Sequence, residues 1–155
     1  MTMETNCGNI YFSARKTAGL TQERWAELLG LSVDAVGQYE RDVILPSDEV
    51  VLRMAEAAGQ QIICYWHLLH KSRCAGTVLP EVEKRPLSEA VLELLYRLEH
   101  FSSGGMKELV RIGADGKVDR DEQESFADCM SELQSLIRAA YELHYAEGKG
   151  AGGRE

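Results

Sequence analysis

The sequence has little positive charge and no long apolar run, and each shortage excludes a class of protein. Lys and Arg number 17 against 25 Asp and Glu, a formal charge of -8. This balance disfavours a polycation that coats nucleic acid or a membrane and leaves only local basic contacts. No apolar run approaches the roughly 18 residues of a spanning helix. The first residues also lack a basic stretch followed by an apolar one, so we expect a cytoplasmic protein without a membrane contact.

The cysteines are also few and form no recognisable framework. They are Cys7, Cys64, Cys74 and Cys129. Because no two of them form a C-x-x-C pair, the sequence indicates neither a disulfide framework nor a zinc ribbon, and we expect reduced thiols. Four soft ligands do recur at intervals of three, three and four residues, namely Cys64, His67, His70 and Cys74. That segment must also fill a core beside Trp66, so we expect neither a metal nor a cofactor.

Only three prolines interrupt the chain, and apolar residues recur three and four positions apart without runs of strict alternation. This periodicity predicts an all-α protein. In the first 70 residues it predicts five helices, at about 9–18, 22–29, 33–41, 48–58 and 60–70. Thr21, Ser32 and Ser47 are suited to cap helix N-termini, and Gly30 is suited to end a helix. We therefore expect a compact five-helix domain over residues 1–70.

The composition changes after this domain. Residues 71–85 contain Gly76, Pro80 and mixed charge but no helical periodicity, so we expect a linker. Residues 86–147 are predicted to form a second helical domain. In it, Ser102-Ser103-Gly104-Gly105 breaks the first helix and 106–112 forms a short second one. Residues 148–155 are expected to be disordered.

The second domain carries two apolar stripes. One runs along the helix from Leu87 to Phe101. The other is a near-heptad seam on a final helix of more than about 25 residues, which Asp119 and Glu122 begin as a capping box. The seam comprises Phe126, Cys129 or Met130, Leu133, Leu136 or Ile137, Ala140, and Leu143 or His144. Each stripe is either ordinary core or a dimer interface, since a long helix in a small domain has surface to spare.

The motif that carries chemistry lies between Gln22 and Tyr39, in QERWAELLGLSVDAVGQY. It predicts two helices joined at Gly30-Leu31-Ser32, with small Ala26 where the helices cross closely and with Val36 facing inward. Further positions of the same pattern are Ala14-Arg15-Lys16, Ala18-Gly19-Leu20-Thr21, Tyr39-Glu40 and Pro46. Together these residues resemble the Cro/lambda-repressor-like, XRE-type helix-turn-helix family, over about residues 10–69.

The resemblance implies a DNA-binding transcriptional regulator whose helix 33–41 enters the major groove. In such a domain Gln22 braces the phosphate backbone. The residues that match base-reading positions are Val33, Asp34, Gly37 and Gln38, with Ser32 and Arg41 nearer the phosphates. By their chemistry, Gln38 suits adenine, Asp34 suits cytosine N4 and Val33 suits a thymine methyl. Arg15 and Glu40 match a pair that, in the family, forms a structural ion pair between the first and third helices.

The charge of the first domain works against strong DNA binding. Residues 1–75 hold 7 Lys and Arg against 9 Asp and Glu, so phosphates are attracted only locally, as by Lys16, Arg24 and Arg41. We expect a repressor of bacterial or phage type that binds double-stranded DNA as a homodimer, because paired half-sites about 34–36 Å apart give a small domain its specificity. The alternative is a protein-interaction adaptor or antitoxin whose C-terminal helices bind a partner protein.

Neither catalysis nor calcium binding is indicated. The sequence holds no Gly-rich phosphate loop, nucleophile elbow or obvious acid–base pair, so we do not expect an enzyme. Residues 115–122 resemble the second half of an EF-hand loop. Arg111 and Gly113 stand where the first ligands belong, and neither side chain can coordinate calcium.

Overall fold

The structure of the protein is a computed structural model that describes residues 9–146. The chain divides into two compact units, Met1–Leu79 (unit 1) and Pro80–Glu155 (unit 2). This division falls inside segment 71–85, for which a linker is predicted. Cys7 and the tail predicted for 148–155 lie outside the described residues. No β-strand occurs within residues 9–146, and the all-α prediction is confirmed.

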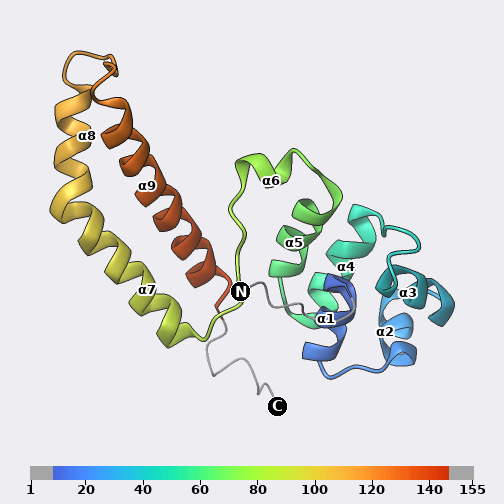
Figure 1. Ribbon diagram of the computed structural model, residues 1–155. Helices are drawn as coiled ribbons and strands as arrows, with labels where there is room; N and C mark the ends of the chain where they lie inside the picture. The colour runs from blue at the N-terminus through green and yellow to red at the C-terminus, as the bar shows by residue number, and fades with distance from the viewer. Residues whose placement is uncertain (1–8, 147–155) are drawn as a thin grey trace. The chain divides into compact units, whose positions relative to one another are not determined.

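The helices of unit 1 are α1 (Ile10–Thr17), α2 (Gln22–Leu29), α3 (Val33–Glu40), α4 (Asp48–Ala58), α5 (Ile62–Lys71) and α6 (Ala75–Val78) (Figure 1). The short helix α6 lies within the segment for which no helix is predicted. Local hydrogen bonds explain it, because the Ser72 hydroxyl accepts from the Ala75 N–H at 3.4 Å and the Thr77 hydroxyl donates to the Cys74 carbonyl at 2.7 Å. Such side-chain bonds stabilise a single turn without an apolar stripe.

Capping side chains determine where the long helices of unit 1 begin. Asn9, Thr21, Ser32 and Ser47 each accept a hydrogen bond from a backbone N–H of the first turn. These bonds satisfy donors that an α-helix leaves without partners. Gly30 ends α2 in the left-handed conformation, with φ of 65°, which costs little in a residue without Cβ. Both kinds of signal are local in sequence, so the predicted boundaries agree with the structure.

The core of unit 1 draws on all of its long helices. The largest fully buried side chains in it are Tyr11, Trp25, Leu29, Met54 and Ile63. Polar contacts accompany them, because the Tyr11 hydroxyl hydrogen-bonds to buried His67 Nδ1 at 2.7 Å and His67 Nε2 lies 3.0 Å from Asp48 Oδ1. Helices α1, α4 and α5 are thereby joined by apolar packing and by a chain of hydrogen bonds from Tyr11 through His67 to Asp48.

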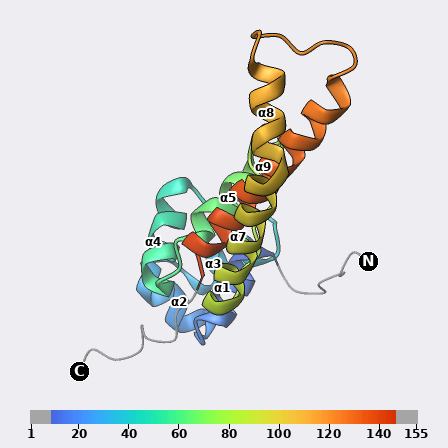
Figure 2. The ribbon, with the colours of Figure 1, turned by 90° about the vertical axis from the view of Figure 1, so that its left-hand side faces the viewer.

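The described part of unit 2 is a helical hairpin. Its elements are α7 (Leu87–His100), the π-helical segment η1 (Phe101–Gly105), α8 (Met106–Gly113) and α9 (Gln123–His144). Helix α7, η1 and α8 follow one another and lie alongside α9 (Figure 2). The predicted break at Ser102-Ser103-Gly104-Gly105 is therefore wrong. The hydroxyls of Ser102 and Ser103 donate to the carbonyls of Glu99 and His100, and the backbone continues as a π-helix through residues whose composition suggests a turn.

Gly105 lies directly against α9. A Cβ at this position would lie 2.6 Å from Glu132 Oε2 and 2.7 Å from the Phe101 ring, so a larger residue would displace both neighbours. A Cβ on Gly104 would meet nothing within 4 Å. The Sγ of Cys129 lies 3.6 Å from the Gly105 carbonyl oxygen, and burial raises the pKa of this thiol. The hairpin is therefore tightly packed where η1 meets α9.

Helix α9 is shorter than predicted and its buried side is shifted. It has 22 residues and begins at Gln123. The side chain of Glu122 does accept a hydrogen bond from the Asp119 N–H, at 3.2 Å, but this bond closes a turn ahead of the helix. Along the predicted seam, Ala140 is exposed and Ala139 is buried in its place. Near its C-terminal end, the buried side of α9 is therefore shifted by one residue from the predicted heptad positions.

A buried ion pair explains why the C-terminal end of the seam is polar. Glu142 is 2% exposed and accepts hydrogen bonds from Arg85 Nε at 2.7 Å and from the Glu83 N–H at 3.4 Å. The segment before α7 therefore lies against α9. Glu142 is buried where the pattern predicts Leu143 or His144, because Arg85 reaches it from a distant part of the sequence.

Much of the apolar surface of α7 is uncovered. Leu87, Val91, Leu95 and Leu98, which we call the α7 stripe, are 43%, 36%, 56% and 45% exposed. Their spacing of four, four and three places them along one side of the helix. The predicted stripe from Leu87 to Phe101 is thus divided, since Leu94 and Phe101 are half-buried. No helix within residues 9–146 is both long and apolar enough to cross a membrane.

Candidate nucleic-acid interface

Helices α2 and α3 pack against each other across a tight turn (Figure 1). Ser32 begins α3 by accepting a hydrogen bond from the Ala35 N–H at 3.1 Å. Val36 is fully buried in the core of unit 1, so the opposite side of α3 faces solvent. The residues predicted to contact DNA lie on α3 and at its ends. Gly37 is buried and Gln38 is half-buried; the exposed ones are Ser32, Val33, Asp34 and Arg41.

A buried ion pair fixes α3 against α1. Arg15 Nε donates to Glu40 Oε1 at 2.5 Å and Arg15 Nη2 donates to Glu40 Oε2 at 3.1 Å, and the two side chains are only 6% and 3% exposed. Arg15 Nη1 also donates to the Leu20 carbonyl at 2.8 Å. Gln22 Nε2 donates to Glu40 Oε2 at 2.8 Å, so this first residue of α2 is joined to the pair. Bidentate, charge-assisted bonds of this kind fix orientation as well as distance.

A second set of contacts holds the end of α3. Asn9 Nδ2 donates to the Tyr39 carbonyl and, at 2.7 Å, to Asp42 Oδ1. His70 Nε2 lies 3.1 Å from the same Asp42 oxygen. Asp42 has a φ of 55°, a left-handed conformation that Asp tolerates better than most residues. Side chains from the start of α1 and from α5 therefore determine where the chain leaves α3.

Two contacts organise the exposed side of α3. Gln38 Nε2 donates to Asp34 Oδ2 at 2.6 Å, an i, i+4 pair on the helix surface. The Arg41 guanidinium lies over Gly37, since a Cβ on Gly37 would be 3.1 Å from Arg41 Nη1. Val33, 41% exposed, adds an apolar side chain to the same element. This surface presents a carboxylate–amide pair, a cation and an apolar group along about two turns of helix.

Positive charge around the helix pair is sparse. Arg24 Nη1 lies 2.6 Å from Glu27 Oε2, which offsets its charge. In the first turn of α2, hydrogen bonds from the backbone N–H of Glu23 and from the Thr21 hydroxyl hold the pKa of Glu23 below its ordinary value. Lys16 lines a hollow with Thr21, Gln22 and Glu23 at the N-terminus of α2, and the Glu23 carboxylate there opposes an anion that Lys16 and the helix N–H groups attract. Attraction of phosphates therefore depends on a few local contacts.

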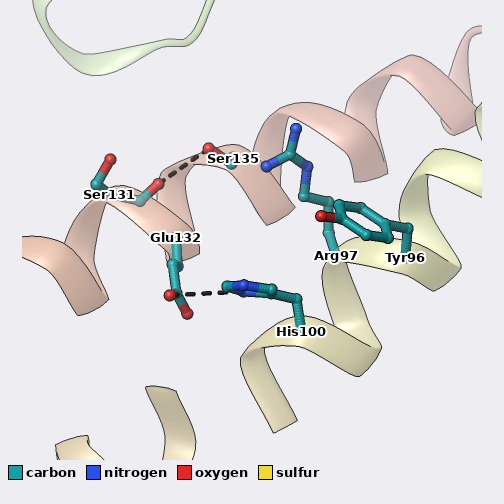
Figure 3. Close-up of a pocket in the computed structure, with 6 residues that line it drawn as sticks. All are labelled: Tyr96, Arg97, His100, Ser131, Glu132 and Ser135. Carbon is teal, nitrogen blue, oxygen red and sulfur yellow. Dashed lines mark hydrogen bonds and ion pairs between the residues drawn. The ribbon is translucent and has the colours of Figure 1, made fainter. Parts of the chain in front are cut away.

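A polar pocket lies on the hairpin of unit 2 (Figure 3). It is lined by Tyr96, Arg97 and His100 of α7 and by Ser131, Glu132 and Ser135 of α9. His100 Nδ1 lies 3.5 Å from Glu132 Oε1. Arg97 Nε donates to Glu93 Oε1 at 2.8 Å, and this bond holds the pKa of Glu93 below its ordinary value. Of these two contacts, only that of His100 with Glu132 crosses from α7 to α9, whereas Arg97 and Glu93 belong to the same helix.

The four candidate soft ligands do not come together, since Cys64, His67 and His70 lie on α5 and Cys74 directly precedes α6. His67 contacts Tyr11 and Asp48, whereas His70 contacts Asp42. Burial raises the pKa of the Cys64 thiol, and Cys74 is exposed. Within residues 9–146, no group of three or more His, Cys, Asp or Glu side chains is arranged to hold a metal ion.

Comparison with known families decides the class of unit 1. A family model described as Helix-turn-helix matches residues 13–61, about a third of the chain. Residues 13–61 form an XRE-type helix-turn-helix domain. Domains of this family are DNA-binding regulatory domains, and the match spans α2, α3 and α4 with most of α1. Searches among curated proteins and among solved structures gave no match for the chain.

The helix-turn-helix domain contains two contacts that the sequence analysis missed. They are the bond between Gln38 and Asp34 and the position of the Arg41 guanidinium over Gly37. Each joins residues four apart on α3, so the i, i+4 spacing was a signal that could have revealed them. Gln22 was expected to brace phosphate only, and its bond to Glu40 shows that it also contacts the buried ion pair.

Proposed function

We propose that the protein is a sequence-specific transcriptional repressor of bacterial or phage type, acting in the cytoplasm, that reads the major groove with α3. The observation that carries this proposal is the exposed side of α3, which presents an oriented amide and an apolar side chain on a helix held at several points by α1, α2 and α5. A rigid helix with varied chemistry on its free side is suited to reading base edges.

The proposed residues divide into those that contact bases or phosphates and those that hold α3 in place. Gln38 pairs with adenine and Val33 packs on a thymine methyl, and the Asp34 carboxylate lies on the same exposed side of α3. Ser32 and Arg41 contact phosphates at the two ends of α3, and Gln22 does so from α2. The Arg15–Glu40 pair is a support, because both side chains are almost fully buried.

We propose that the protein acts as a homodimer that occludes an operator of two half-sites. The supporting observation is the uncovered α7 stripe, because exposed apolar side chains in a row are typical of an interaction surface. A dimer also compensates for the few phosphate contacts of one domain, since binding of the second half-site becomes effectively intramolecular once the first is bound. The same stripe favours the second candidate function, in which the hairpin binds a partner protein and DNA contact is secondary.

Selection of bound duplexes from a random pool, using the full chain, tests the proposal. We expect a two-fold symmetric site and binding that weakens steeply as salt rises. Gln38→Ala should weaken binding to the selected site by about 1–3 kcal/mol and leave binding to random duplex nearly unchanged. Arg41→Ala should weaken binding to all duplexes together and reduce the salt slope by about one.

Two results would contradict the proposal. Enrichment of no sequence, together with weak binding at low salt, would favour the adaptor function. An equal effect of Gln38→Ala on selected and random duplexes would remove Gln38 from the base edges.

A further inference from the structure

We infer that Asp34 is a positioning residue for sequence readout, whose carboxylate orients the Gln38 amide so that Gln38 selects adenine over guanine. This inference rests on the proposed function, because it assigns the specificity of the same surface. It changes the main role of Asp34 from a base contact to an orienting group.

The orientation follows from the chemistry of the two side chains. Gln38 Nε2 donates to Asp34 Oδ2 at 2.6 Å. An ionised carboxylate has only lone pairs to offer, so only the nitrogen side of the amide can face it. A glutamine without such a neighbour can turn its amide by half a rotation and exchange oxygen for nitrogen. The Asp34 carboxylate therefore selects one of two amide orientations before any DNA is present.

The selected orientation leaves Gln38 with one donor and one acceptor. One N–H of the amide is used by Asp34, so the other N–H and Oε1 remain for a base edge. Adenine offers the acceptor N7 and the donor N6–H, which match this pair, whereas guanine offers the acceptors N7 and O6. With guanine, the amide oxygen would face O6, so the oriented amide penalises guanine at this position.

The surroundings of Asp34 favour this role over a purely structural one. The helix N-terminus is already capped by Ser32, so Asp34 is not needed for that bond. Its charge also repels phosphates and weakens binding to any sequence. Asp34 does interact favourably with the N-terminal end of the α3 dipole, and that effect alone would alter stability but not the choice of base.

Two variants separate the loss of the carboxylate from a change of side chain as such. Asp34→Ala removes the acceptor, whereas Asp34→Glu keeps an acceptor-only carboxylate and its charge four residues before Gln38. The ratio of binding to the adenine and guanine duplexes is insensitive to the charge itself, because both duplexes carry the same phosphates. We measure binding of the full chain to the selected duplex, to that duplex with the adenine at the Gln38 position changed to guanine, and to random duplex. Wild-type protein should prefer adenine by about tenfold or more.

For Asp34→Ala this preference should fall below about threefold, and for Asp34→Glu it should stay close to the wild-type value. Asp34→Ala should also bind random duplex more tightly than wild type, because it loses a negative charge, whereas Asp34→Glu should bind random duplex as wild type does. An adenine preference that survives in Asp34→Ala overturns the inference. So does a loss of preference at a neighbouring cytosine alone, because Asp34 would then read that base itself.

A spectroscopic measurement on the free protein gives an independent readout. The side-chain amide protons of Gln38, assigned with the Gln38→Ala variant, should differ in chemical shift and exchange rate in wild type, and this difference should shrink in Asp34→Ala. Unchanged amide signals in Asp34→Ala overturn the inference. A wild-type protein without any sequence preference overturns both the inference and the proposed function, whereas an unaltered preference in Asp34→Ala overturns the inference alone.

Discussion

Unit 1 and unit 2 bury their apolar residues to very different degrees. Among the largest fully buried side chains of the chain, Trp25, Tyr11, Leu29, Met54 and Ile63 belong to unit 1. Unit 2 contributes Ile112 and the carboxylate of Glu142 to the same group. A bundle of five helices can enclose side chains from several directions, whereas a hairpin of two helices covers only one side of each.

The difference indicates that unit 1 is stabilised by its own core, whereas unit 2 leaves apolar surface that is available for contact with a further surface. Unit 1 contains a complete core, and its helices are joined by buried polar pairs. Unit 2 leaves large apolar side chains exposed along α7, among them Leu92 at 67% and Leu95 at 56%.

Removal of a large core side chain should affect unit 1 far more than removal of an apolar residue from the hairpin surface. Trp25→Ala should lower the free energy of unfolding of unit 1 by about 3–5 kcal/mol, because Trp25 is fully buried. Leu92→Ala in unit 2 should change stability by about 0.5 kcal/mol or less. Urea denaturation followed by circular dichroism measures both. Similar effects of the two variants would mean that the contrast in burial does not govern stability.

The buried ion pair should be strongly non-additive. Arg15→Ala or Glu40→Ala alone should cost about 3 kcal/mol, because each leaves one buried charge without its counter-charge. The double variant should cost less than the two single costs together. The exposed pair Arg24–Glu27 is the control, and its double-mutant cycle should give about 1 kcal/mol or less. Additive effects at Arg15 and Glu40 would contradict the buried pair.

A charge on the α7 stripe should separate copies of the chain without unfolding unit 2. Leu95→Glu should weaken self-association at least about tenfold, because the interface would bury an unpaired carboxylate. Tyr96→Glu is the control, since Tyr96 is also exposed but lines the polar pocket away from the stripe. Sedimentation at several concentrations, with circular dichroism, measures both properties. An unfolded unit 2 would identify the stripe as core, and an unaltered dimer would place the interface elsewhere.

The smallest expected effect is the contribution of Asp48 to the pH dependence of stability in unit 1. A hydrogen bond from Lys71 Nζ at 2.6 Å, with that from His67, holds the pKa of Asp48 below its ordinary 3.8. The folded state therefore favours the carboxylate, so the stabilisation is complete above pH 3.8 and is lost as the pH falls through the lower folded-state pKa.

Asp48→Asn should lower the Tm of unit 1 at neutral pH by about 2 °C or less. It should also reduce the drop in Tm that wild type shows on acidification below pH 3.8. Glu49→Gln, in the same helical turn, is the control. Identical acid profiles of Asp48→Asn and wild type would show that the bonds to Lys71 and His67 do not stabilise the folded state.

Features set by neighbouring residues could be predicted from the sequence. The caps at Thr21, Ser32 and Ser47 and the left-handed Gly30 depend on residues within one helical turn, and the boundaries of α2, α3 and α4 follow from them. The exposed side of α3 followed in part from the same periodicity, because burial of Val36 turns Val33 and Asp34 to solvent. Gly37, predicted to face outward, is buried, since the Arg41 guanidinium lies over it.

Features set by distant residues could not be predicted in the same way. Glu142 is buried because Arg85 pairs with it, and no local pattern reveals that contact. The composition of Ser102-Ser103-Gly104-Gly105 suggests a turn, but this segment stays helical and packs along α9, with Gly105 directly against it. Within the candidate site, Gln22 could be identified as a helix-starting residue, but its bond to Glu40 depends on how α2 and α3 cross.

The packing of Gly105 also bears on how the sequence can vary. Gly104 and Gly105 are adjacent and chemically identical, yet only Gly105 has atoms of α9 and of Phe101 where a Cβ would stand. In a library of variants selected for a folded hairpin, position 104 should accept many amino acids, whereas position 105 should accept fewer and smaller ones, because any side chain there must move the Glu132 carboxylate and the Phe101 ring. Two adjacent glycines therefore differ in how freely the sequence can change at each of them.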